Sequence, residues 1–163
     1  MIEEDWLPRS AAPEPSGIDL RVAPVTPLPA DMGGSGEVLV TVAFGSVKLP
    51  VGEVRQGESL QQAARRVALT ITGAVVRPER LVYIVEQAGR QLLVCVLCAL
   101  EDASDVEDKP AARFVRVASD TDIEPAALRE LLIEDGPSGF VRPCAWVVST
   151  FDAAGQPAAE VRW

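Results

Sequence analysis

The sequence LPVGEVRQGESLQQAARRVALTITG, residues 49–73, decides the predicted fold. Ser59 is a good helix N-cap, and Gln62 follows at the spacing of a capping box. Gly73 stands where a glycine can take the left-handed conformation that ends a helix. The pattern therefore predicts a helix over residues 59–72. Its apolar residues recur at the spacing of one buried helix face: Leu60, Ala63, Ala64, Val67, Ala68 and Ile71.

The same stretch resembles the signature of the Nudix hydrolase superfamily. That signature runs Gly, five residues, Glu, seven residues, Arg-Glu-apolar-x-Glu-Glu-x-Gly-apolar. The positions that match it here are Gly52, Glu58, Arg66, Gly73 and Ala74. The resemblance covers residues 49–73 by motif and most of residues 37–135 by the order of the elements. It implies an α/β fold, a Nudix-like α/β/α sandwich with a mixed β-sheet.

The departures from the signature lie at three helix positions. The family has glutamates where this chain has Val67, Thr70 and Ile71. In Nudix enzymes those carboxylates hold the magnesium that activates water and clamps a diphosphate, and magnesium prefers oxygen ligands. Between Ser59 and Ala74 there is no Asp or Glu at all. The resemblance therefore implies a degenerate Nudix box without metal ligands, and we expect no catalytic residue, metal or cofactor.

Glu58 and Arg66 are both kept. In the family these two residues pair and brace the loop against the helix, and the resemblance implies the same role here. We interpret the matching positions Gly52, Glu58, Arg66 and Gly73 as a structural remnant of the motif.

Length, charge and composition exclude several classes of function. The chain has 163 residues, which suits one domain with a sizeable core. Its 15 basic and 24 acidic residues give a formal net charge of −9. Because nucleic-acid binding needs a basic surface, this charge argues against a nucleic-acid partner. The sequence has no histidine, which excludes Ser-His-Asp and Cys-His catalysis and histidine metal sites.

The three cysteines are Cys95, Cys98 and Cys144. The first two lie in the apolar run 92–100, where strand residues three apart point to opposite faces. We therefore expect buried thiols, not a zinc or redox site. The sequence shows no signal peptide and no apolar run long enough for a membrane helix. We expect a cytoplasmic protein with reduced cysteines and no membrane partner.

Residues 1–36 differ in composition from residues 37–163. The first segment is rich in proline and glycine, and such a segment cannot easily bury enough apolar area to offset its ordering entropy. We interpret it as an N-terminal tail before a Nudix-like domain. Trp6, flanked by Ile2 and Leu7 among acidic residues, is typical of a short docking peptide.

Runs of β-branched, aromatic and other apolar residues between turn residues predict the strands. An edge strand over residues 18–22 is a further possibility. The last two strands would form a closing hairpin that could carry both Trp146 and Trp163. The predicted strands cover residues 37–44, 46–49, 81–86, 91–100, 113–117, 144–151 and 158–163.

A second helix is predicted over residues 124–133. Thr121 or Asp122 can cap it, and Pro125 suits its first turn. Strands interleaved with two helices favour a mixed sheet with one helix on each side.

Two of the functions compatible with these features use the cleft of the fold. An active Nudix-type diphosphate hydrolase would need relocated carboxylates, for which the candidates are Glu53, Glu58, Glu86, Glu101 and Asp102. A sensor would bind a nucleotide or an ADP-ribose-like ligand without cutting it. Its phosphate contacts would be Arg55, Arg65 and Arg66.

The function that we favour is a catalytically inactive protein-interaction or scaffold subunit, whose partner is another protein or a further copy of the chain. An apolar helix face in place of the metal ligands must be covered by something. Trp6 would anchor the tail, either on that helix face or, as we favour, on a partner. The candidate binding residues are Trp6, Arg55, Val67 and Ile71.

Overall fold

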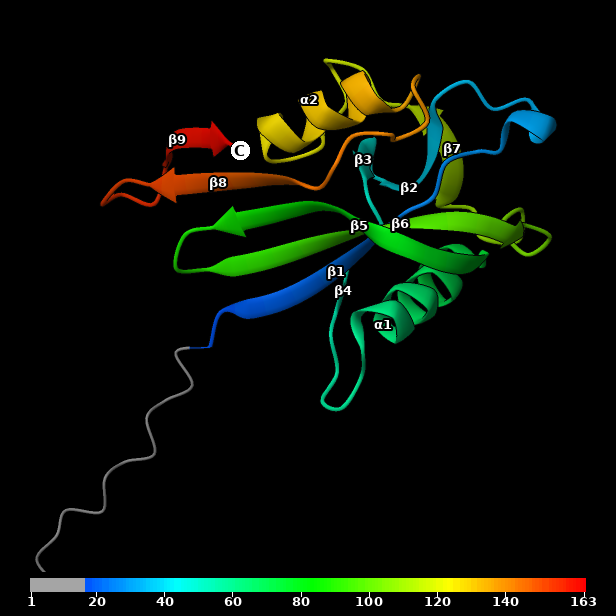
Figure 1. The fold of residues 1–163 in the computed structure, drawn as a ribbon, viewed down its shortest axis with the longest axis horizontal. Helices are drawn as coiled ribbons and strands as arrows, with labels where there is room; N and C mark the ends of the chain where they lie inside the picture. Colours follow the sequence, from blue (N-terminus) through cyan, green and yellow to red (C-terminus); the bar gives the residue numbers. More distant parts are fainter. Residues whose placement is uncertain (1–16) are drawn as a thin grey trace, which may run out of the picture.

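The computed structural model describes residues 17–163, so the expected anchor Trp6 lies outside the described residues. In the described part, the strands and helices follow one another as Figure 1 shows. The strands are β1 (Asp19–Val25), β2 (Glu37–Ala43), β3 (Ser46–Lys48), β4 (Gly52–Glu53), β5 (Val75–Gln87), β6 (Gln91–Asp102), β7 (Ala112–Arg116), β8 (Ala145–Phe151) and β9 (Pro157–Arg162). The helices are α1 (Leu60–Val67), which continues as a π-helical segment over Ala68–Thr72, and α2 (Ala126–Asp135), with a short 3₁₀ turn at Ala30–Met32.

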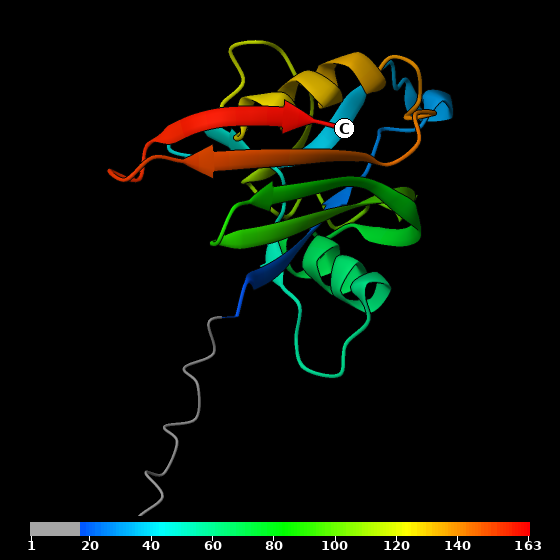
Figure 2. The same cartoon turned by 60° about the vertical axis from the view of Figure 1, so that its left-hand side comes forward.

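A mixed six-stranded sheet forms the centre of the fold. Its strand order is β4-β1-β6-β5-β8-β9, with parallel pairs β1/β6 and β5/β8 and antiparallel neighbours elsewhere. A smaller sheet has the order β3-β2-β7. Helices α1 and α2 lie on opposite sides of the large sheet (Figures 1 and 2). The predicted α/β/α sandwich with a mixed sheet is confirmed.

Strand β1 lies inside the sheet and is longer than the edge strand suggested over residues 18–22. It pairs along its whole length with β6, and only its residues Arg21 and Val22 pair with the short β4. Pro24 therefore sits where β1 has no second neighbour, which is where a strand tolerates proline. The expected N-terminal tail of residues 1–36 thus contributes a buried strand to the fold.

Strand β5 begins at Val75, six residues before the predicted strand over residues 81–86. Its early part contains Pro78 and two irregular steps in the pairing with β6, one of them between Pro78 and Arg80. Proline and bulges break the local alternation of apolar and polar residues, so this half of the strand carries no clear sequence pattern.

Helix α2 begins two residues later than predicted and has no side-chain cap. Neither expected cap residue is free for the role. The Thr121 hydroxyl accepts a hydrogen bond from the backbone N–H of Ala118, and the Asp122 carboxylate accepts one from the Ser46 hydroxyl. In the first turn of α2, the backbone N–H of Ala127 donates instead to Glu160 Oε2 at 3.1 Å, so a tertiary contact takes the place of the predicted local cap.

The central strand β6 is covered on both faces over residues 93–98, as predicted from its continuous apolar sequence. Cys95 belongs to the core cluster on the α2 side and Cys98 to the one on the α1 side. Burial raises the pKa of both thiols to about 12. Both cysteines therefore act as small apolar residues and not as nucleophiles. Within residues 17–163, no helix is long and apolar enough to cross a membrane.

A buried polar contact ties α2 to the sheet. The hydroxyl of Tyr83 in β5 donates to Asp135 Oδ2 at 2.7 Å, and Nε of Arg142 donates to Asp135 Oδ1 at 2.9 Å. Burial raises the pKa of the Tyr83 phenol, and the hydrogen bond to Asp135 raises it further. Tyr83 therefore remains a neutral donor, and the carboxylate at the end of the helix is satisfied on both oxygens.

We expect Tyr83→Phe to lower the free energy of unfolding by about 1–3 kcal/mol, because one oxygen of a buried carboxylate loses its donor. Urea unfolding at neutral pH measures the change. Tyr83→Phe in an Asp135→Asn background completes a double-mutant cycle. A cycle without coupling between the two residues would show that this contact does not anchor the helix.

Candidate functional site

The loop and helix that carry the motif have the local structure that the sequence predicts. Ser59 and Gln62 form a complete capping box, since each side chain accepts a hydrogen bond from the backbone N–H of the other residue. Gly73 ends the helical segment with a φ of 77°. A side chain at Gly73 would also place its Cβ 2.6 Å from the carbonyl oxygen of Asp105. Glycine is therefore required there both for its conformation and for space.

Glu58 and Arg66 form the expected brace. Arg66 Nε donates to Glu58 Oε1 at 2.8 Å, and Arg66 Nη2 donates to Glu58 Oε2 at 3.0 Å. The same Nη2 also donates to the carbonyl oxygen of Glu53 at 2.7 Å. The hydrogen bond from Arg66, together with one from the backbone N–H of Arg55, lowers the pKa of Glu58 to about 2. The pair thus fastens the loop from Gly52 to Ser59 onto the helix.

Val67 occupies the first of the family's metal-binding positions, and it is a core residue. Its side chain is 1% exposed and belongs to the core cluster between α1 and the sheet. A Cβ on Gly52 would lie 2.6 Å from Val67 Cγ2, so the helix and strand β4 approach closely at this point. The expectation that Val67 presents a binding surface is therefore wrong, because the residue has no exposed surface to offer.

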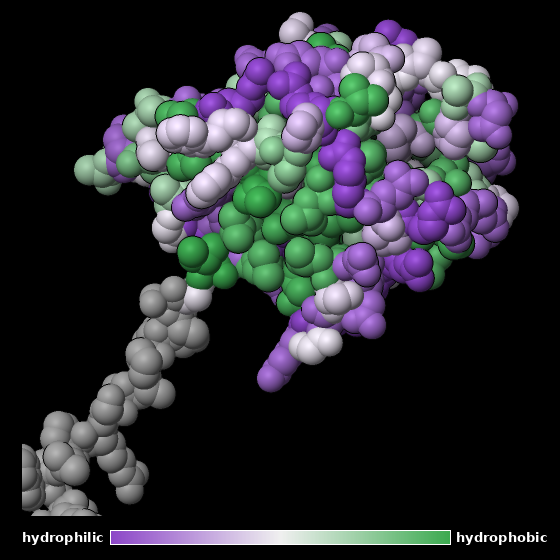
Figure 3. Space-filling view, in the orientation of Figure 1, coloured by the Kyte–Doolittle hydropathy of each residue, from purple (hydrophilic) through white to green (hydrophobic). Residues whose placement is uncertain are grey.

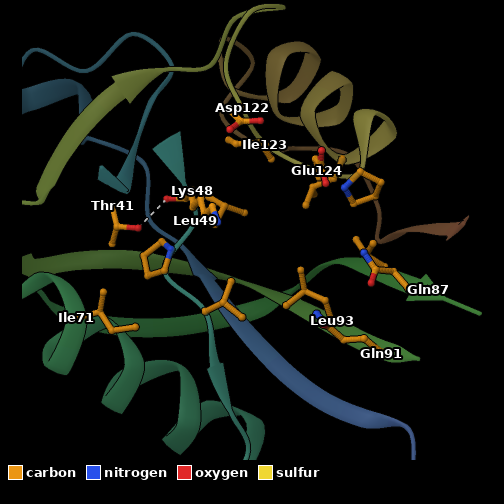
Figure 4. A pocket seen from close by; sticks show the side chains of 15 residues that line it. Thr41, Lys48, Leu49, Ile71, Gln87, Gln91, Leu93, Asp122, Ile123 and Glu124 are labelled. Atoms are coloured by element: carbon orange, nitrogen blue, oxygen red, sulfur yellow. Dashed lines mark hydrogen bonds between the residues drawn. The ribbon is translucent and has the colours of Figure 1, made fainter. Parts of the chain in front are cut away.

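Ile71 lies in a pocket of about 530 Å³ on the α2 side of the large sheet (Figure 4). The pocket is formed by the segment from Lys48 to Val51, by the ends of β5 and β6, and by residues 122–128 before and within α2. Its polar residues include one lysine and two carboxylates. The lining consists of Thr41, Lys48, Leu49, Pro50, Val51, Ile71, Val85, Gln87, Gln91, Leu93, Asp122, Ile123, Glu124, Pro125 and Leu128.

The three arginines proposed as phosphate contacts do not line this pocket. Arg66 is committed to Glu58, and the backbone of Arg55 supports the same carboxylate. Arg65 lines a separate pocket of about 180 Å³ with Pro78, Gln61 and Gln62. The residues that sequence reasoning missed are Gln87 and Gln91. They are register partners that flank the β5–β6 turn, so both side chains face the same side of the sheet. Their position on either side of the turn is the one sequence signal that could have found them.

The residues present do not fit the magnesium that the family's chemistry requires. Thr70 is exposed and offers one hydroxyl, while Val67 and Ile71 offer no oxygen. Of the proposed relocated carboxylates, Glu58 is paired with Arg66, and Glu53 lies 3.6 Å from Arg21. Glu101 and Asp102 lie at the far end of β6. Within residues 17–163, no three His, Cys, Asp or Glu side chains gather in a way that could hold a metal ion.

The side of the large sheet that carries α1 is only partly covered. Helix α1 packs on β1, β5 and β6, and its buried residues join Val22, Val94 and Val96 in one cluster. Beyond the helix, apolar side chains on the same side remain exposed or half-buried. We call this surface the open sheet face; it consists of Leu20, Leu81, Ile84, Leu92, Trp146, Val148, Val161 and Trp163.

The pairing register puts these eight residues on one side. Leu20 is opposite Leu92, Ile84 is opposite Val94 and Trp146, and Val148 is opposite Val161. Trp146 and Trp163 exchange two backbone hydrogen bonds, so their side chains also share a face. Trp146 is 47% exposed and Trp163 is 76% exposed. Figure 3 shows the apolar surface that continues over this side of the molecule.

No protein-family model and no curated protein matches the sequence. A NUDIX hydrolase from Nitrosomonas europaea is similar in structure, with a TM-score of 0.63 and 17% identity over 82% of this chain and 78% of that one. An ADP-ribose pyrophosphatase from Streptococcus suis 89-1591 has a TM-score of 0.57 and 18% identity over 82% of this chain and 98% of that one. A MutT protein from Bacillus halodurans has a TM-score of 0.55 and 11% identity over 89% of this chain and 97% of that one. These similarities show the fold: the chain has the Nudix hydrolase fold.

We expect the Glu58–Arg66 pair to make the protein acid-sensitive. Because folding lowers the pKa of Glu58 from 4.5 to about 2, its stabilising effect is complete above pH 4.5 and is lost as pH falls toward 2. Glu58→Gln lacks that effect at every pH. The difference in melting temperature between wild type and Glu58→Gln should therefore shrink across this window. Glu53→Gln is the matched control, and a difference that stays constant with pH would contradict the linkage.

We expect Gly52→Ala to destabilise the fold by about 1–3 kcal/mol, the usual cost of overpacking, because the new methyl group meets Val67 Cγ2. Val67→Ala removes that methyl partner. The double variant should therefore lose less stability in urea unfolding than the two single losses together. Simple additivity would mean that the backbone moves apart instead.

Proposed function

We propose that this chain, which has the Nudix hydrolase fold, is a catalytically inactive protein-interaction or scaffold subunit that works in the cytoplasm. The single observation that carries the proposal is that the helix of the motif has no carboxylate where the family's chemistry needs three. Val67 is in the core, Ile71 contributes an apolar side chain to the pocket, and Thr70 carries only a hydroxyl.

The rest of the motif supports stability instead of catalysis. The Glu58–Arg66 brace and the close contact between Gly52 and Val67 position the loop and the helix, as they would in an enzyme. A carboxylate at position 67 would be buried, and a buried charge is costly without a cation beside it. Valine removes that cost, so the present residues suit a fold that holds no metal at this position.

The open sheet face supports the interaction role. Soluble monomers rarely expose large contiguous apolar surfaces unless these bind something. Two tryptophans lie on this face, and tryptophan is enriched among residues that dominate binding energy. The face lies on the α1 side of the sheet, whereas the pocket lies on the α2 side. A partner on the open sheet face would therefore leave the pocket accessible.

The pocket supports a second candidate, a sensor for a small ligand. Its volume of about 530 Å³ is in the range of small-molecule sites. Its charged lining residues are Lys48, Asp122 and Glu124, so carboxylates outnumber cations. A diphosphate would meet more negative than positive charge there. The lining favours a neutral or cationic ligand that hydrogen-bonds to Gln87 and Gln91 over a nucleotide or an ADP-ribose-like one.

We expect no magnesium-dependent hydrolysis of ADP-ribose or of nucleoside triphosphates. Phosphate release or product formation should match that of a Glu53→Ala/Glu58→Ala variant, while a catalytically active Nudix enzyme assayed in parallel turns over. Turnover by the wild-type chain above the double variant would establish the hydrolase alternative. A thermal shift with ADP-ribose in the absence of turnover would favour the nucleotide sensor.

We expect Val161→Glu to abolish partner binding by placing a charge on the open sheet face. Val141→Glu is the matched control, since Val141 is also an exposed valine but lies outside that face. The partner is identified by affinity capture and mass spectrometry, purified, and its Kd measured for each variant. Equal Kd values for wild type and Val161→Glu would contradict the interaction role of this face.

A further inference from the structure

The open sheet face adjoins the point where the described chain begins. Ile18 is 55% exposed, and Leu20, two residues later, is the first residue of the face. Leu20 pairs with Leu92 of β6, so the described chain begins beside the apolar surface. Figure 3 shows the uncovered apolar side chains of this side continuing toward that point.

We infer that residues 1–16 bind the open sheet face of the same molecule, with Ile2, Trp6 and Leu7 as their apolar contacts. The inference deepens the proposed function, because it names what occupies the face before a partner does. It rests on that function in one respect, namely that the face is a binding surface. The segment then acts as an internal competitor that a protein partner must displace.

The preceding segment is long enough to cross the face. Leu7 lies 11 residues before Ile18, and an extended chain spans about 3.3 Å per residue, which gives a reach of about 36 Å. The strand order places four spacings of about 4.8 Å, or about 19 Å, between β1 and β9. Leu7 and Trp6 can therefore reach Trp146 and Val161 without stretching the chain. Prolines restrict the backbone in the unbound chain, and this lowers the entropy that the segment would lose on binding.

The sequence of the segment is complementary to the face. Ile2, Trp6 and Leu7 supply large apolar groups, and they are the three such groups that residues 1–16 contain besides Met1. The acidic residues between them would remain at the rim in water. The helix face at Val67, which the sequence suggests as the intramolecular binding surface, is closed to them because Val67 is packed in the core.

Tethering favours this occupant over a second copy of the chain. A short flexible tether gives an effective concentration on the order of 1 mM, which a separate molecule would have to match. Two copies meeting face to face would also bring together two chains that each carry a net charge of −9. The segment therefore occupies the open sheet face in most molecules if the Kd of the free peptide for that face is below about 0.1 mM.

The first test uses the full chain with Ile2→Ser, Trp6→Ser and Leu7→Ser together. We expect this variant to bind several-fold more of the apolar dye ANS than the wild type, because the face becomes uncovered. Ala11→Ser/Ala12→Ser is the control within the same segment and should leave dye binding unchanged. Equal dye binding by the wild type and the triple-serine variant overturns the inference.

The second test adds a synthetic peptide of residues 1–16 to the triple-serine chain, monitored by calorimetry. We expect saturable binding below about 0.1 mM, loss of binding when Val161→Glu is added, and no loss with Val141→Glu. Absence of binding at a peptide concentration of about 1 mM, or binding that is unchanged by Val161→Glu, overturns the inference.

Sedimentation of the wild type tests whether a second copy of the chain, instead of residues 1–16, covers the open sheet face. A monomer at all concentrations is expected, and a dimer that Val161→Glu dissociates means that a second copy covers the face. Failure of the inference and failure of the proposed function give different results. If the peptide fails but a purified partner still requires Val161, the inference falls and the proposed function stands. If the peptide binds and no partner depends on Val161, the face is occupied only from within and the scaffold role fails.

Discussion

The width of a single helix, compared with that of a six-stranded sheet, determines how much of the sheet on the α1 side remains uncovered. A helix with its side chains is about 10–12 Å wide, and strands are about 4.8 Å apart, so one helix covers two to three strands. Helix α1 covers β1, β6 and β5. On the opposite side, α2 and residues of the smaller sheet, including Val38 and Val40, share one core cluster with the large sheet. The open sheet face is what remains on the α1 side: β8 and β9, together with the parts of β1, β5 and β6 that lie beyond the helix.

The same helix keeps the local geometry of the motif without the carboxylates that the family's chemistry needs. The capping box, the Glu58–Arg66 pair and Gly73 all act through backbone and loop contacts. None of these contacts needs a metal. Two of the three residues that replace the family's acids contribute apolar side chains to the packing, since Val67 fills the core and Ile71 lines the pocket, whereas Thr70 is exposed. Stability and catalysis therefore depend on separable parts of one short sequence.

The two surfaces available for binding lie on opposite sides of the large sheet. The pocket contacts Val85 and Leu93, which are register partners on the α2 side. The open sheet face contains Ile84 and Leu92, their immediate neighbours, whose side chains point the other way. A ligand in the pocket and an occupant of the face would thus share the same two strands without sharing any atoms of contact.

The sequence by itself determined what depends on neighbouring residues. It predicted the cap at Ser59, the stop at Gly73, the opposite orientations of Cys95 and Cys98 and the absence of acids on the helix. Spacing on one element is enough for each of these. The Nudix-like sandwich followed from that motif and from the order of strands and helices.

Only the tertiary structure decided which of these elements meet and which surfaces they cover. The pairing of β1 with β6 joins residues far apart in sequence. The proline-rich composition of residues 1–36 gave no sign of this pairing. Alternation along β8 and β9 shows that one face is apolar, but not whether a helix lies over it. The burial of Val67, the joining of Gln87 and Gln91 to Lys48 in one pocket, and the exposure of Trp146 depend on packing between distant segments. Local sequence cannot specify them, because each depends on what the rest of the chain leaves uncovered.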